Sequence, residues 1–236
     1  MEDSPIPMRQ WCYAFWAACS SKKGVSAMQI HRMTGVSYKS SLHMMHRIRR
    51  AMAPANATDG GKLSGIVEAD ETYVGGKRRN GRTGRPRGGE KAPVLGFVER
   101  GGRVRLRHVA NLTTPNTQAA IKEHIAKSSR LITDEFGIYT RIGREFEGGH
   151  DTICHGDGEY GRGDVTTNII EGVFALLKRG MKGTFHSVTP KHLHRYLNEF
   201  EFRYNTRHVD DGAREALAID GANNKRLTYQ QQVANA

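Results

Sequence analysis

The sequence predicts a mixed α/β protein in which a small helical head precedes a mixed β-sheet covered by helices. Apolar residues recur at helical spacing near the start, follow strand patterns from about residue 64, and return to helical spacing near the end. Strands followed by alternating helices and strands are typical of a mixed sheet with flanking helices. We therefore expect a head at 1–55, a linker at 56–63, an α/β domain at 64–208 and a tail at 209–236.

Charge is the feature of the composition that departs most from an average protein. The 236 residues include 36 lysines and arginines against 24 acids, a formal net charge of +12, and 37% of the residues are apolar. Such a surplus favours a polyanionic partner such as double-stranded DNA, because cations that meet phosphates release condensed counterions. A surface that is basic only for solubility is the alternative.

Apolar runs, targeting signals and cysteine spacing indicate the cellular location that we expect for the chain. There is no apolar run of the roughly eighteen residues that a membrane span needs, and no signal-peptide pattern, so we expect no membrane partner and a cytoplasmic, nucleoid-associated location. Cys12, Cys19 and Cys154 are widely spaced and include no C-x-x-C pair. This spacing favours reduced thiols over a disulfide framework or a cysteine-rich zinc site.

The head contains the pattern of a helix-turn-helix. A first buried helix is expected over 10–20. Ser26 can cap a short second helix that ends at Gly35, and Ser37 can cap a third helix that runs to about Met52. The apolar side chains expected to pack between the second and third helices are Ile30, Met33, Val36, Leu42, Met45 and Ile48.

The opposite side of the third helix is basic. It carries Lys39, His43, Arg47 and Arg50, which suit phosphates and the base edges of a major groove. Two short helices joined by a glycine-containing turn can also be an ordinary helical hairpin with a solvated basic face. DNA binding by this helix is therefore an expectation with a structural alternative.

The central region has the patterns of strands and helices in alternation. Strands are expected at 65–76, 93–100, 103–112, 129–136 and 150–156, and helices at 116–126 and 168–179. Between Gly75 and Ala92 lies a glycine-rich basic stretch, which we expect to be a loop that tracks a DNA backbone and orders on binding. A solvated insertion is the alternative. The cations assigned to DNA in this loop are Lys77, Arg78, Arg79, Arg82, Arg85 and Arg87.

Three acids are placed where a metal site would need them. Asp70 and Asp134 each end an apolar strand, and Glu171 stands in the first turns of the helix at 168–179. A carboxylate at the end of a buried strand is costly unless a positive charge compensates it. Oxygen ligands of this kind hold pairs of Mg²⁺ or Mn²⁺ ions, which promote in-line phosphoryl displacement.

The helix that carries Glu171 is strongly amphipathic. Glu171 and Lys178 are seven residues apart, so they fall within about 20° of each other at the border of the apolar stripe. The stripe itself consists of Ile170, Val173, Phe174 and Leu177.

Each of these residues also has an ordinary structural interpretation. Asn168 and Glu171 resemble a capping pair, and Lys178, beside Arg179, can be a plain surface lysine. Asp134 can be a turn acid and Asp70 a surface acid at a strand end. The joint appearance of the acids in order, on strand, strand and helix, favours the site.

Five stretches between 64 and 208 resemble the DDE transposases of bacterial insertion sequences, nearest to the IS-fifteen-ninety-five (ISXO-like) group: VEADETYVGGK, APVLGFVERGG, TDEFGIY, TNIIEGVFALLKRGMKGTFHSV and KHLHRYLNEFEFRYNTR. The resemblance implies an RNase H-like catalytic core and two Mg²⁺ ions, for which Mn²⁺ can substitute. It also implies cutting and joining of double-stranded DNA at transposon ends.

The motifs of the resemblance assign roles to individual residues. They make Asp70 the first acid, Asp134 the second and Lys178 the trailing lysine. The third member falls in TNIIEG, where Glu171 has the usual spacing of seven residues to the lysine. Asn168 is the second candidate, because some members of the group are described with an asparagine as third member.

The resemblance also sets expectations for the rest of the chain. Members of the group often begin with a cysteine-rich zinc ribbon, and its absence here means that this form has lost it or that the printed start lies inside a longer reading frame. We expect the long helix from Pro190 to about Arg207 to pack over the catalytic domain, and a homodimer or larger assembly on DNA. A non-catalytic DNA-binding protein, a decayed transposase, and an RNase H-like nuclease that cuts without joining are the alternatives.

Overall fold

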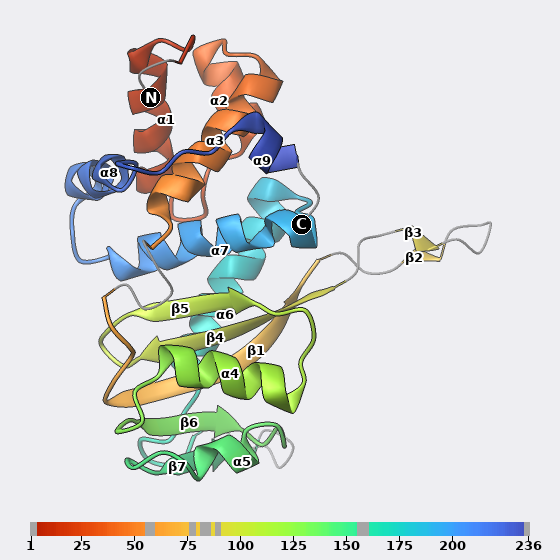
Figure 1. The fold of residues 1–236 in the computed structure, drawn as a ribbon, viewed down its shortest axis with the longest axis vertical. Helices are drawn as coiled ribbons and strands as arrows, with labels where there is room; N and C mark the ends of the chain where they lie inside the picture. The colour runs from red at the N-terminus through yellow and green to blue at the C-terminus, as the bar shows by residue number, and fades with distance from the viewer. Residues whose placement is uncertain are drawn as a thin grey trace. The chain divides into compact units, whose positions relative to one another are not determined.

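The computed structural model describes residues 4–54, 60–75, 79–80, 86–87, 91–154 and 161–233 (Figure 1). These residues form two compact units: a helical one made of 1–54 with 179–236, and an α/β one made of 55–178. No helix in the described ranges is both long and apolar enough to cross a membrane.

The helical unit begins with the three helices that the sequence predicts. They are α1 (Met8–Ser20), α2 (Ala27–Thr34) and α3 (Tyr38–Met52). The Ser26 hydroxyl caps α2 through the Gln29 N–H, the Ser37 hydroxyl caps α3 through the Ser40 N–H, and Gly35 ends α2 with a φ of 72°. The two caps and the glycine stop therefore confirm the predicted bounds of these helices.

The core of this unit corrects one packing prediction. Ile30, Met45 and Ile48 are fully buried, as expected, and they pack with Trp11 and Phe15 of α1. Met33 is 56% exposed and accepts a hydrogen bond from the Tyr13 hydroxyl at its sulfur, at 3.2 Å. The prediction that Met33 belongs to the core is wrong, because it lies at the outer end of α2, close to the glycine stop.

The C-terminal region of the chain, from residue 179, completes the helical unit. After the π-helix Met181–Phe185 come α7 (Pro190–Asn205), α8 (Asp211–Asp220) and α9 (Tyr229–Val233). The apolar face of α7 packs against α3, whereas we expected this helix to cover the catalytic domain. The contact is fixed by a buried carboxylate: Glu199 accepts the Arg49 Nε–H at 2.6 Å and a hydrogen bond from Arg203. These two cations hold the pKa of Glu199 below its usual range despite its burial.

The α/β unit is built on one five-stranded sheet. Its strands are β1 (Ile66–Val74), β4 (Ala92–Glu99), β5 (Val104–His108), β6 (Arg130–Asp134) and β7 (His150–Ile153), in the order β5-β4-β1-β6-β7. The pairs β5/β4 and β4/β1 are antiparallel, and the pairs β1/β6 and β6/β7 are parallel. The helices α4 (Thr114–His124) and α5 (Thr140–Gly143) make the crossovers before β6 and β7. This mixed sheet, with helices in its crossovers, confirms the mixed α/β architecture that the sequence predicts.

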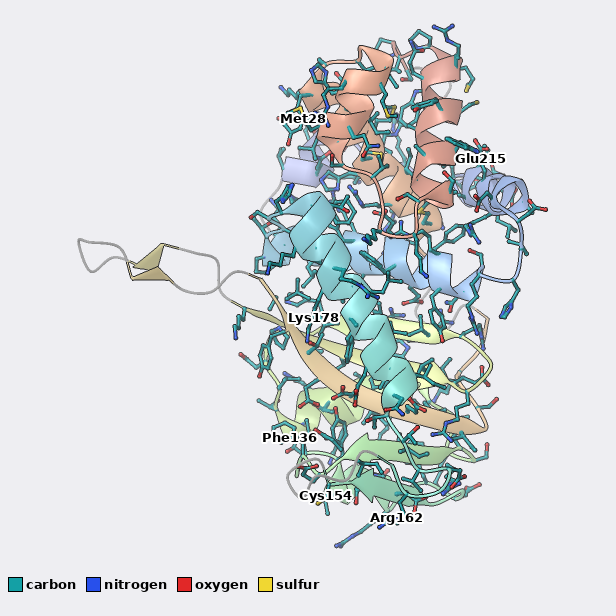
Figure 2. The ribbon with its side chains drawn as sticks, turned by 180° about the vertical axis from the view of Figure 1, so that it is seen from behind. Met28, Phe136, Cys154, Arg162, Lys178 and Glu215 are labelled. Atoms are coloured by element: carbon teal, nitrogen blue, oxygen red, sulfur yellow. The ribbon has the colours of Figure 1, made fainter. Side chains whose placement is uncertain are left out.

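Helices cover both faces of this sheet. Ile121 of α4 packs on one face, against Val67 and Phe97. The other face meets α6 (Asn168–Gly180), which Figure 2 shows lying across the strands. Gly96 of β4 makes this approach possible, because a Cβ at that position would lie 2.6 Å from Phe174 and 2.7 Å from Ile170. The predicted apolar stripe of α6 is confirmed: Ile170, Val173, Phe174 and Leu177 are all buried.

The basic stretch between Gly75 and Ala92 contains more regular structure than the expected loop. Two short strands, β2 (Arg79–Asn80) and β3 (Pro86–Arg87), pair antiparallel within it. The side chains of Arg79 and Arg87 lie outside the description. So do the whole residues Lys77, Arg78, Arg82 and Arg85.

Candidate active site

Three carboxylates meet where β1 and β6 run side by side. Asp70 lies in β1 and Asp134 ends β6, and these strands pair in parallel with Glu68 opposite Ile132. Continuing this register by two residues brings Asp70 beside Asp134. Carboxylate oxygens of Asp70, Glu71 and Asp134 all lie within 4.8 Å of one another. The structure therefore brings the two predicted strand acids together and adds Glu71 to them.

The carboxyl of Asp70 has an unusual proton affinity. Burial is the main cause that raises its pKa, to about 7, and the neighbouring charges of Glu71, Asp134 and Glu171 raise it further. The backbone N–H of Glu71 donates to Asp70 Oδ1 at 2.7 Å and lowers the pKa in part. Crowded, partly buried carboxylates of this kind form an oxygen donor set that suits a divalent cation.

Glu71 is held on the opposite side of β1 from Asp70. Successive strand residues point to opposite faces, and the Glu71 carboxylate accepts the hydroxyl of Tyr139 at 2.5 Å. Tyr139 is fully buried, and both burial and the adjacent carboxylates raise its pKa well above the usual range. Burial is also the main cause that raises the pKa of Glu71. Glu71 was not among the predicted site residues, although it directly follows Asp70. The prediction that Asp70 ends its strand is wrong, because β1 continues to Val74 and stays paired with β4 over these residues.

Glu171 enters the site from α6. Its charge is one of those that raise the pKa of Asp70, so the two carboxyls are close enough to interact electrostatically. The hydroxyl of Thr167, which is buried, donates to Glu171 Oε1 at 2.9 Å. Thr167 is therefore a local partner of Glu171, and the capping pair that we expected between Asn168 and Glu171 stays a prediction. Asn168 is exposed and is the first residue of α6.

The beginning of α6 is fixed to β1 by Glu68. This buried carboxylate accepts the backbone N–H groups of Ile169 and Ile170 at 3.0 and 3.1 Å. A helix cannot satisfy the N–H groups of its own first turn, and a negative charge is favoured at that end. Glu68 and Asp70 are two residues apart, so they project from the same face of β1. Sequence analysis missed this role, although a glutamate inside an apolar strand was the available sign.

The cations of α6 lie beyond the acids. Lys178 and Arg179 are both exposed, and Lys178 is labelled on this helix in Figure 2. Seven residues of helix separate Glu171 from Lys178, about 10 Å along the axis, and both residues are solvent-accessible. A DNA strand with one phosphate at the acids could therefore place a neighbouring phosphate near Lys178.

The basic face of α3, defined as Lys39, His43, Arg47 and Arg50, is covered in part by the C-terminal segment. His43 Nδ1 lies 2.6 Å from Gln232 Oε1, and Lys39 Nζ lies 4.9 Å from the ring centre of Tyr229. Leu227 lines one small pocket together with Arg47 and Arg50. Lys39 and Arg50 are exposed while His43 and Arg47 are half-buried, so only part of the expected DNA-binding face is open.

The chain is similar to a protein from a transposable element and, weakly, to a solved structure. A protein described as "Uncharacterized protein in transposable element ISH50", from Halobacterium salinarum, is 28% identical over 218 residues, which cover 86% of this chain and 71% of that protein. Among solved structures, the chain is similar to the pre-cleavage Mos1 transpososome, with 12% identity and a TM-score of 0.33 over 96% of this chain and 83% of that one. A TM-score of that size supports no statement about fold or function.

A family model gives the decisive comparison. The model described as "ISXO2-like transposase domain" matches residues 62–205, which is more than half of the chain. The matched region contains Asp70, Asp134, Glu171 and Lys178. It also contains α7, which packs in the helical unit. The chain therefore belongs to the ISXO2-like transposase family.

Proposed function

We propose that this transposase cuts DNA at the ends of an insertion sequence and joins those ends to target DNA by two-metal chemistry. The observation that supports this most directly is the meeting of Asp70 and Asp134 on the neighbouring strands β1 and β6. Glu171 adds a third negative charge close enough to raise the pKa of Asp70. Family membership supports the general class of activity, and the cluster of acids supports a role for metal ions in it.

Asp70, Asp134 and Glu171 would hold two Mg²⁺ ions, for which Mn²⁺ can substitute. Hard cations prefer carboxylate oxygens, and those of Asp70 and Asp134 lie within 4.8 Å of each other, with Glu71 in the same cluster. Glu171 is not in that cluster, but its charge is close enough to raise the pKa of Asp70, and a cation would relieve this repulsion. When bound, such a pair of ions activates the attacking oxygen and stabilises the leaving oxygen of a phosphoryl displacement. Asn168 stays the second candidate for the third position, where its amide would contribute less charge.

The remaining residues of the site would bind and orient DNA. Lys178 would hold a phosphate of the reacting strand as a compact point charge, with Arg179 beside it. The same carboxylates would serve both steps: water attacks the strand at the end of the element, and the freed 3′-hydroxyl then attacks target DNA. The basic face of α3 and the cations of the 75–92 stretch would bind the flanking duplex.

We also propose a division of function along the chain and an assembly of several subunits on DNA. The head at 1–55 would recognise DNA and the region 64–208 would carry the chemistry, which agrees with the family match over 62–205. Joining two element ends requires both ends in one complex. We therefore propose at least two subunits on DNA.

A nicking and strand-transfer assay tests the proposal. Purified chain is mixed with labelled DNA that carries the element's ends, with a target plasmid and Mg²⁺. We expect Asp70→Ala, Asp134→Ala and Glu171→Ala each to reduce both products by more than about a hundredfold, because each removes charge from the metal site. Glu147→Ala, which changes an exposed acid of the α/β unit, should leave both products unchanged. Duplex binding should persist in all four variants.

The other outcomes separate the alternatives. Duplex binding without any nicking by the unsubstituted chain would favour a non-catalytic or decayed protein. Nicking without strand transfer would favour a nuclease. Full activity of Asp70→Ala would contradict the assignment of the site.

A further inference from the structure

We propose that Glu68 and Arg100 are positioning residues that set the third acid, Glu171, against the first, Asp70. This inference rests on the proposed two-metal function and concerns how the site is assembled. Glu68 is a buried acid that has specific hydrogen-bond partners. Glu68 is completely inaccessible to solvent, yet it lies in the middle of an otherwise apolar strand segment.

The partners of Glu68 belong to two separate segments, the start of α6 and Arg100 directly after β4. Its Oε2 accepts the N–H groups of Ile169 and Ile170 at the start of α6, and its Oε1 accepts the Nε–H of Arg100 at 2.9 Å. Taking a carboxylate out of water costs several kcal/mol unless hydrogen bonds and an opposite charge compensate it. Here both are present, so the buried carboxylate has compensating partners in a specific geometry.

Arg100 extends the link to the segment that leads into α6. Its two terminal nitrogens donate to the Asp164 carbonyl at 2.6 Å and to the Thr166 carbonyl at 3.1 Å. Its own backbone N–H donates to the carbonyl of Ile66 in β1 at 3.0 Å. One arginine therefore ties the approach to α6 to the same strand that carries Glu68.

The geometry connects the first and third acids through a short rigid path. Glu68 and Asp70 share one face of β1, and the amides that Glu68 binds belong to the two residues directly before Glu171. Thr167 restrains the Glu171 carboxylate from the other side at 2.9 Å. A metal site needs its ligands within fractions of an ångström, so outer partners that orient a ligand contribute to metal affinity.

A metal-binding cycle tests the inference without DNA or turnover. The number and affinity of bound Mn²⁺ ions are measured by electron paramagnetic resonance for the full chain and for Glu68→Gln, Glu171→Gln and the double variant. We expect Glu68→Gln to weaken binding by about 10–100-fold, the effect usual for an orienting partner. In the Glu171→Gln background, the same change should have almost no further effect, because the residue acts through Glu171.

Controls separate positioning from folding. Glu99→Gln alters a glutamate of the same unit that accepts the N–H and hydroxyl of Ser64, and it should leave Mn²⁺ binding unchanged. If Glu68→Gln does not fold, Arg100→Lys replaces it in the cycle, because lysine keeps the charge but loses the forked contacts. The inference would be overturned if the folded Glu68 or Arg100 variant bound Mn²⁺ as tightly as the unsubstituted chain. It would also be overturned if the loss of Mn²⁺ affinity in the double variant equalled the sum of the losses in the two single variants. A wild-type chain that binds no Mn²⁺ would instead overturn the proposed function.

Discussion

Replacing Asp70 by asparagine is expected to stabilise the metal-free protein at high pH. The pKa of Asp70 is about 7 in the folded chain against a usual value of 3.8, mainly because the carboxyl is buried. The folded state therefore keeps its proton between these two values while the unfolded state has lost it. This contribution to stability is complete below about pH 4 and is lost as the pH rises through about 7.

The size of the effect follows from the same two pKa values. Their difference corresponds to at most ~4 kcal/mol, at ~1.4 kcal/mol for each tenfold change in proton affinity. The carboxyl is partly accessible to solvent, which screens the interaction, so we expect about 2 kcal/mol. Asparagine imitates the protonated acid and does not ionise. At about pH 8 the variant should therefore melt roughly 4–8 °C above the wild type.

Thermal melting with a chelator present measures this difference. The two proteins should have nearly equal midpoints at about pH 4, and the gap should open towards pH 8. Mg²⁺ should narrow the gap at pH 8, because it stabilises only the chain that binds it well. The control Glu147→Gln, at an exposed acid, should follow the wild type at both pH values. A gap between wild type and Asp70→Asn that does not change with pH would refute the reasoning.

Three further predictions concern packing, metal affinity and DNA binding. Gly96→Ala should destabilise the protein by about 1–3 kcal/mol in a melting experiment, because the added methyl group would lie 2.6 Å from Phe174. The control Gly172→Ala, at an open helix position, should not destabilise it. Mn²⁺ affinity should rise about tenfold between pH 6 and pH 8 in a binding titration, as Asp70 ionises, and a flat profile would contradict its role as a ligand. A chain that ends at Arg226 should bind duplex DNA about tenfold more tightly in an anisotropy assay, a gain of ~1.4 kcal/mol, because the basic face of α3 is uncovered. The removed residues carry no charged side chain, so their loss does not change the charge of the side chains. Unchanged binding would mean that the basic face of α3 does not bind DNA. Weaker binding would mean that the removed segment itself contacts DNA.

Local rules were sufficient for most of the fold. The Ser26 and Ser37 caps, the Gly35 stop and the glycine pair between β4 and β5 mark ends that depend on nearest neighbours only. The apolar stripe of α6 was readable for the same reason, since helical spacing fixes which side chains share a face. Met33 was misassigned because helical spacing does not say where the covering surface ends.

The parts that could not be predicted depend on contacts between distant segments. Glu68 and α6 are about a hundred residues apart in the chain, and sequence spacing alone does not reveal that one caps the other. The packing of α7 on α3, and the cover over Lys39 and His43, likewise join the two ends of the chain. Asp134 was found because it ends its strand, and the order of the motifs identified Asp70 and Glu171, whereas the supporting residues carry no such mark.

Anomalous diffraction from crystals grown with Mn²⁺ tests the central claim most directly, because it places the ions without reference to activity. We expect two peaks about 3.5–4 Å apart, each in contact with carboxylate oxygens of Asp70, Asp134 or Glu171. Well-ordered carboxylates in saturating Mn²⁺ with no peak between them, or ions bound only elsewhere on the chain, would contradict it.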